Sequence, residues 1–97
     1  MLNANETILL VEYDRVDIMT VQRALKKNQI TNPLHVARTG LEALSMLRGE
    51  DGFDRISPPP ELILLDLNLP KMSGIEFLSE LRSDPELQDL RIIVLTS

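Results

Sequence analysis

Three side chains with oxygen donors stand directly after short apolar runs, at points where buried strands would end. They are Glu12, Asp66 and Thr96. In open α/β sheets the ligand crevice lies outside the carboxyl ends of the strands, so we expect these three side chains to converge. Two carboxylates and a hydroxyl form an oxygen-rich pocket that suits a hard cation such as Mg²⁺. The same pocket could hold a phosphoryl group.

Each of these residues taken alone has a simpler explanation. A carboxylate at a strand end is most often a solvated turn residue, and a threonine there most often makes a local hydrogen bond. The joint placement is stronger evidence than any single residue. Asp66 follows four apolar residues and precedes the segment 67–70, which ends in Pro70. This segment predicts a rigid turn that directs the carboxylate upward from the strand end.

The apolar pattern predicts four strands that alternate with three helices. Unbroken apolar runs are typical of strands buried on both faces of a parallel sheet. Asp14 can cap the segment that follows it. Thr39 and Ser73 each have a glutamate three residues later, which is the spacing of a capping box. The predicted strands are 7–11, 34–37, 62–66 and 92–95, and the predicted helices are 14–28, 39–49 and 73–84.

This alternation predicts an α/β fold, a doubly wound parallel sheet with right-handed crossovers and helices on both faces. The chain has 97 residues, 43% of them hydrophobic and 26% charged, which suits one globular domain without an internal boundary. A formal charge of −5 argues against nucleic acid as a partner. The sequence has no cysteine and no signal peptide or membrane span, so we expect a cytoplasmic protein.

Motifs after three of the predicted strands make the chain resemble the receiver domains of two-component response regulators. They are Val11-Glu12 with Asp14, Leu64-Leu65-Asp66-Leu67-Asn68-Leu69-Pro70 with Met72-Ser73-Gly74, and Leu95-Thr96-Ser97. The resemblance implies a flavodoxin-like sheet with strand order 2-1-3-4. It also implies that residues 1–97 form an incomplete receiver domain, in which the fifth strand and the last helix-strand-helix are absent.

The resemblance assigns a role to each residue that matches the family motif. Asp66 is the phosphoacceptor, which takes a phosphoryl group from the phosphohistidine of a sensor histidine kinase. Thr96 contacts the phosphoryl group, and Glu12, Asp66 and the backbone carbonyl of Asn68 bind Mg²⁺. The three-proline loop before the third strand and the segment 40–44 resemble most the single-domain regulators that partner phytochrome-type kinases. The implied function is a phosphorylation-dependent switch rather than an enzyme.

Position 13 departs from the family pattern, because Tyr13 stands where a second metal-binding acid is usual. A neutral phenol is a poor Mg²⁺ ligand, so weak Mg²⁺ binding is expected. Asp14 could reach the metal site, but its simpler role is to cap the first helix, with Asp17 reinforcing the cap. A lysine that contacts the phosphoryl group in the family would lie on the absent fifth strand.

Arg15 is a second departure, because a cation in the first turn of a helix opposes the helix dipole. Its side chain is either solvated or, as a sharper alternative, folded over Glu12 and Asp66 in partial replacement of the metal charge.

Two alternative functions compete with the switch, and one predicted strand indicates self-association of the chain. The loss of an acid at Tyr13 would suit a receiver-like module that binds partner proteins without phosphorylation. An aspartate-nucleophile phosphatase is disfavoured, because it needs a second acid at the position of Asn68. Finally, the strand 92–95 reads as buried on both faces, and an unpaired edge there predicts a homodimer or higher association.

Overall fold

The computed structural model describes residue 3 and residues 5–95, and within this part it contains all seven predicted elements. Thr96, which is predicted to lie beside Glu12, is therefore outside the described residues. The strands are β1 (Ile8–Val11), β2 (Leu34–Ala37), β3 (Leu62–Asp66) and β4 (Arg91–Leu95). The helices are α1 (Arg15–Lys27), α2 (Gly40–Arg48) and α3 (Gly74–Ser83).

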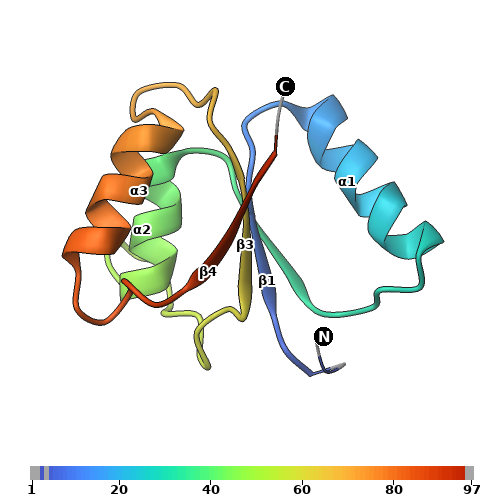
Figure 1. Cartoon of the computed structure of the whole chain (residues 1–97), viewed down its shortest axis with the longest axis horizontal. Coiled ribbons are helices and arrows are strands. Elements are labelled where there is room, and N and C mark those ends of the chain that lie inside the picture. Colours follow the sequence, from blue (N-terminus) through green and yellow to red (C-terminus); the bar gives the residue numbers. More distant parts are fainter. Residues whose placement is uncertain (1–2, 4, 96–97) are drawn as a thin grey trace.

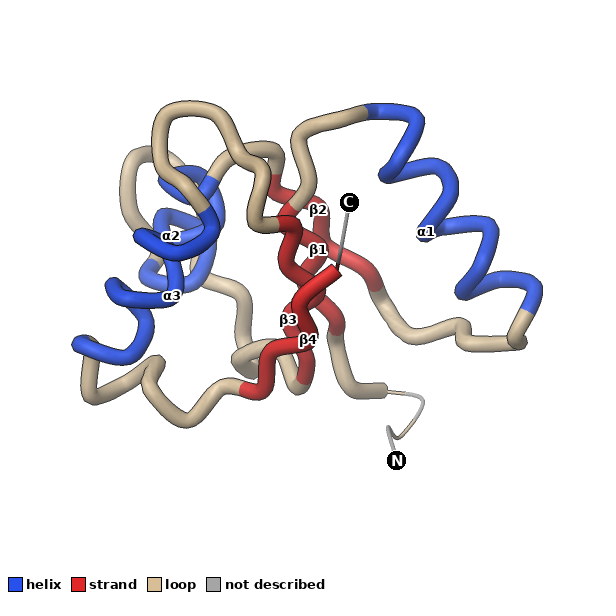
Figure 2. The backbone as a smooth tube through the Cα atoms, turned by 45° about the horizontal axis from the view of Figure 1, so that its top comes forward, coloured by secondary structure: helices blue, strands red, loops and turns tan. Residues whose placement is uncertain are grey.

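The strands form one parallel sheet in the order β2-β1-β3-β4, which confirms the predicted strand order. Helix α1 covers one face of the sheet, and α2 and α3 lie together against the other (Figure 1). A tube view shows the same three layers (Figure 2). The architecture is the flavodoxin-like doubly wound sheet expected from the sequence.

The helix starts follow from short polar side chains that satisfy free backbone N–H groups. Asp14 accepts hydrogen bonds from the amides of Val16 and Asp17. At α3 both halves of the predicted capping box are present, with Ser73 bonded to the Glu76 amide and Glu76 bonded back to the Ser73 amide. At α2 the Glu42 amide donates to Oγ1 of Thr39, so this N-cap forms while the reciprocal half of its predicted capping box is not among the described hydrogen bonds. The caps fix where each helix begins relative to the preceding strand.

Apolar side chains fill the space on each face of the sheet. The larger core lies between the sheet and the pair α2 and α3, and includes the fully buried Phe77 and Leu81. The smaller core lies under α1, where Ile18 packs with Ile8, Leu10 and Leu64. All four residues of β1 are buried, so the strand that carries Glu12 is held from both faces.

The apolar run of strand β4 resembles a strand buried on both faces, but in the described sheet β4 is the partly exposed, unpaired edge that is expected from the sequence. Ile93 is 51% exposed and Val94 is 41% exposed. Within the described sheet β4 pairs only with β3, and Ile92 and Leu95 are its residues that pack on the two cores. An apolar run alone predicts that a strand forms, but the neighbouring elements decide how much of it is covered.

Among the described helices, none is both long enough and apolar enough to cross a membrane.

Candidate functional site

The carboxyl ends of β1 and β3 bring Glu12 and Asp66 together. In the register of the two strands Val11 is paired with Leu65, so the next residue of each strand reaches the same edge of the sheet. Both side chains are 4% exposed, although each carries a carboxyl group. Buried acids of this kind are uncommon unless they are paired, protonated or bound to a cation. The structure thus places two of the three predicted oxygen donors side by side.

Burial and the neighbouring charge alter the acidity of Glu12. Desolvation raises the pKa of Glu12 from its usual 4.5 to about 7, against the lowering effect of a hydrogen bond from the Asp14 amide. A hydrogen bond to Asp66 and the negative charges of Asp66 and Asp17 raise it further. With a pKa of about 7, the Glu12 carboxyl group is partly protonated at neutral pH, and its protonated form can donate to Asp66.

Asp17 adds a third carboxylate to this pair. One oxygen of each of Glu12, Asp17 and Asp66 lies within 4.8 Å of the others. Asp17 is exposed and comes from the first turn of α1, whereas the other two are buried at strand ends. The sequence analysis assigned Asp17 only to the helix cap. Its place one turn into a helix that begins three residues after Glu12 was the available signal.

The loop between β1 and α1 is fixed by the cap itself. The Asp14 amide donates to Oε2 of Glu12 at 3.1 Å, and Oδ1 of Asp14 accepts from the amides of Val16 and Asp17 at 2.8 and 3.1 Å. This agrees with the simpler role predicted for Asp14. The same contacts orient both Glu12 and the first turn that carries Asp17.

The loop after β3 is equally constrained. Oδ1 of Asp66 accepts from the Asn68 amide at 3.0 Å, which orients the carboxyl group. The Gly74 amide donates to the Leu67 carbonyl at 3.0 Å. A Cβ at Gly74 would lie 2.5 Å from the Leu67 Cα, so only glycine allows this approach. The rigid turn predicted after Asp66 is present.

The Tyr13 side chain packs against Arg38 and is half exposed. Its side chain is 50% exposed, and the Arg38 guanidinium lies 4.6 Å from the ring centroid. Arg38 also donates from Nε and Nη2 to the Tyr13 carbonyl at 2.9 and 2.6 Å. A cation over an aromatic face is a favourable contact. Arg38 from the end of β2 thus holds Tyr13 outside the site, a contact that the sequence analysis missed.

Arg15 does not take the place of a metal charge. Within the described part of the chain it makes no ion pair with Glu12, Asp17 or Asp66. The sharper alternative for this residue is wrong, and the solvated one agrees with its exposure. The site therefore has a negative charge that no described basic side chain neutralises.

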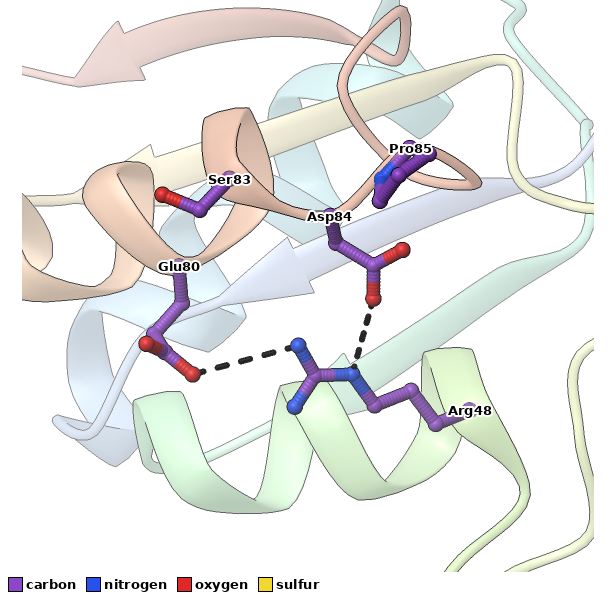
Figure 3. A pocket seen from close by; sticks show the side chains of 5 residues that line it. All are labelled: Arg48, Glu80, Ser83, Asp84 and Pro85. Carbon is purple, nitrogen blue, oxygen red and sulfur yellow. Dashed lines mark hydrogen bonds and ion pairs between the residues drawn. The ribbon is translucent and has the colours of Figure 1, made fainter.

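A second carboxylate cluster lies at the other end of α2 and α3, and it surrounds an arginine (Figure 3). Arg48 contacts Asp84 at 3.2 Å, Glu80 at 3.8 Å and Glu50 at 3.9 Å. A surface pocket of about 410 Å³ lies here, and it is lined by Arg48, Glu80, Ser83, Asp84 and Pro85. Because Arg48 of α2 forms ion pairs with Glu80 and Asp84 at the end of α3, we interpret this cluster as a structural link between the two helices.

The sequence matches the family model described as response regulator receiver domain over residues 8–97. Response regulator Rcp1 of Synechocystis sp. is 42% identical over 95 residues. That alignment covers 98% of this chain and 64% of Rcp1, so the chain spans less than two thirds of that relative.

Solved structures give the same result in three dimensions. The bacteriophytochrome response regulator AtBRR superposes with a TM-score of 0.90 at 36% identity, covering 98% of this chain and 69% of AtBRR. The phosphorylated cyanobacterial phytochrome response regulator RcpA has a TM-score of 0.84 at 41% identity, covering 96% and 66%. The Mn²⁺-bound form of Rcp1 has a TM-score of 0.83 at 43% identity, covering 94% and 65%.

Proposed function

Because this chain belongs to the response regulator receiver domain family, we propose that Asp66 accepts a phosphoryl group and that the chain works as a phosphorylation-dependent switch. The observation that carries the proposal is the buried pair of Glu12 and Asp66 at the carboxyl ends of neighbouring strands. An acid placed there faces the edge of the sheet at which open α/β folds bind their ligands.

The transfer itself needs only a positioned nucleophile and neutralised charge. An oxygen of the Asp66 carboxylate attacks the phosphorus of a phosphohistidine. The new P–O bond forms as the P–N bond breaks, and the histidine leaves with the electron pair. The product is an aspartyl phosphate. The hydrogen bond from the Asn68 amide keeps the nucleophile oriented, and the capped loop keeps Glu12 beside it.

A divalent cation fits the donor set of this site. Three carboxylates face one another, and within the described residues no lysine, arginine or histidine nitrogen lies within ion-pair distance of them. Hard oxygen ligands of this kind suit Mg²⁺ or Mn²⁺. We propose Glu12 and Asp66 as ligands, with the Asn68 carbonyl beside them. When bound, the cation would neutralise charge on the phosphoryl oxygens.

The proposed partner is a sensor histidine kinase of the phytochrome type, because RcpA and AtBRR are named as phytochrome response regulators. We propose that the chain acts in the cytoplasm as a switch rather than as an enzyme, without nucleic acid. The exposed Ile93 and Val94 of β4 support the proposal of association through that strand. No described feature favours the alternative of a phosphorylation-independent module.

Labelling with a small acyl phosphate tests the phosphoacceptor. In the presence of Mg²⁺, intact-mass spectrometry should show one added phosphoryl group on the chain, and none on Asp66→Asn. The matched control is Asp54→Asn, which removes the same charge from an exposed loop position. A label that persists in Asp66→Asn would remove Asp66 from its role.

A further inference from the structure

The first turn of α1 presents a carboxylate to the proposed cation site, and no described contact uses it. We propose that Asp17 is a direct ligand of the divalent cation, together with Glu12 and Asp66. This inference rests on the proposed function, because it names a further ligand of that site.

The distances allow one cation to touch all three groups. The three oxygens lie within 4.8 Å of one another. Opposite ligands of an octahedral Mg²⁺ are about 4.2 Å apart, because each lies about 2.1 Å from the ion. The 4.8 Å limit is close to this separation, and the exposed Asp17 side chain is free to adjust around an ion.

The helix cap does not need the Asp17 side chain. Asp14 accepts the free amides of the first turn, and the Asp14 amide donates to Glu12 rather than to Asp17. Among the described residues the Asp17 carboxylate has no hydrogen bond and no ion pair. A carboxylate that faces two others without a counter-ion is unfavourable unless a cation joins them.

The neighbouring position cannot supply this ligand. Tyr13 is held outward by Arg38 through the ring contact and two hydrogen bonds to its carbonyl. The α1 side of the opening is therefore lined by Asp17 rather than by residue 13. In this chain, the third carboxylate reaches the site from the helix and not from the end of β1.

Calorimetric titration with Mn²⁺ tests the assignment. Asp17→Asn should weaken Mn²⁺ affinity on the order of tenfold or more, since even outer-sphere partners of a metal contribute this much. Asp54→Asn is the matched control, because it removes an exposed carboxylate from the loop before β3, and its affinity should stay close to that of the unaltered chain. Asp66→Asn should lose binding.

A second titration in high KCl separates ligation from simple charge attraction. Salt screens the interaction between exposed charges that are not in contact, whereas a direct ligand keeps its effect. The affinity ratio between the unaltered chain and Asp17→Asn should therefore persist in high KCl. An affinity ratio that falls to one in high KCl overturns the role of Asp17. Equal affinities of the two chains at low salt, while Asp66→Asn loses binding, overturn it as well. In both cases the proposed role of Asp66 as phosphoacceptor is unaffected. Absence of Mn²⁺ binding by the unaltered chain also overturns the role of Asp17, and labelling of Asp66 then judges the function separately.

Discussion

Two clusters of three carboxylates lie at opposite ends of the molecule, and they differ in how their charge is balanced. Glu50, Glu80 and Asp84 surround Arg48 where α2 and α3 end. Figure 3 shows the contacts of Arg48 with Glu80 and Asp84. The other three acids gather where β1 and β3 end, and no basic side chain in the described part of the chain meets them. The first cluster is satisfied within the fold, whereas the second requires a proton or an external cation.

The two clusters also differ in burial, which changes the energetic cost of their charges. The Arg48 side chain is 31% exposed, so water screens its ion pairs and limits what they contribute. Glu12 and Asp66 are nearly inaccessible, and like charges close together in such a place oppose folding. A fold keeps an arrangement of this kind where function requires it. We therefore propose that the unbalanced cluster is the functional one and that the balanced cluster is structural.

The largest expected effect is a pH dependence of stability that comes from Glu12. Its pKa in the folded chain is about 7, above the usual 4.5, so the folded state binds this proton more tightly than the unfolded state does. The contribution is complete below pH 4.5 and is lost as the pH rises through 7. Without divalent cations, urea unfolding should show a loss of about 3 kcal/mol across this range.

Glu12→Gln is the control for that pH dependence. Glutamine keeps an oxygen that can accept from the Asp14 amide but cannot ionise. The unfolding free energy of this variant should vary much less between pH 5 and pH 8. An unchanged slope would show that groups other than Glu12 cause the pH dependence.

Removal of the Arg48 guanidinium should lower the free energy of unfolding by a smaller amount. Arg48→Met keeps most of the apolar length of the side chain and leaves three acids without their partner. We expect a loss of about 1–2 kcal/mol, the sum of partly exposed ion pairs and one charged hydrogen bond. Denaturant unfolding measures it. Arg48→Lys should lose less, and equal stability of Arg48→Met and the unaltered chain would refute a structural role.

The cap of α1 offers an effect of about 1 kcal/mol. Asp14→Ala removes the acceptor for the amides of Val16 and Asp17, and loss of an N-cap typically costs this much. Asp14→Asn keeps the cap and should be nearly neutral for stability. If Asp14→Asn instead weakened Mn²⁺ binding as strongly as Asp17→Asn, then Asp14 would be a ligand and not only a cap.

The smallest expected effect concerns the position of Tyr13. Tyr13→Asp adds an exposed carboxylate near the site, and we expect it to strengthen Mg²⁺ binding by less than about 1 kcal/mol. Calorimetry on the two chains measures it. The gain is small because the side chain at this position lies beside Arg38 and outside the carboxylate cluster. A large gain would mean that residue 13 turns into the site.

Local patterns predicted the elements and the resemblance to receiver domains implied the strand order, whereas some contacts between distant residues escaped prediction. The capping spacings at Thr39 and Ser73 and the apolar runs act over a few residues, so the sequence shows them directly. The meeting of Glu12 with Asp66 follows from the rule on strand ends. The contact of Arg38 with Tyr13 depends on how β2 sits beside β1, which no local spacing encodes. The approach of Asp17 had a local signal, its place in the first turn of a helix that begins three residues after Glu12, but the distance to Asp66 depends on the packing of α1.

The most direct test of the contrast between the clusters is the thermal unfolding midpoint at pH 8 as Mg²⁺ replaces KCl at constant ionic strength. A cation that binds only the folded state raises the midpoint. The account predicts a rise in the unaltered chain, the same rise in Arg48→Met, and none in Asp66→Asn. A midpoint that does not respond to Mg²⁺, or one that responds equally in Asp66→Asn, would contradict a cation site at the carboxyl ends of β1 and β3.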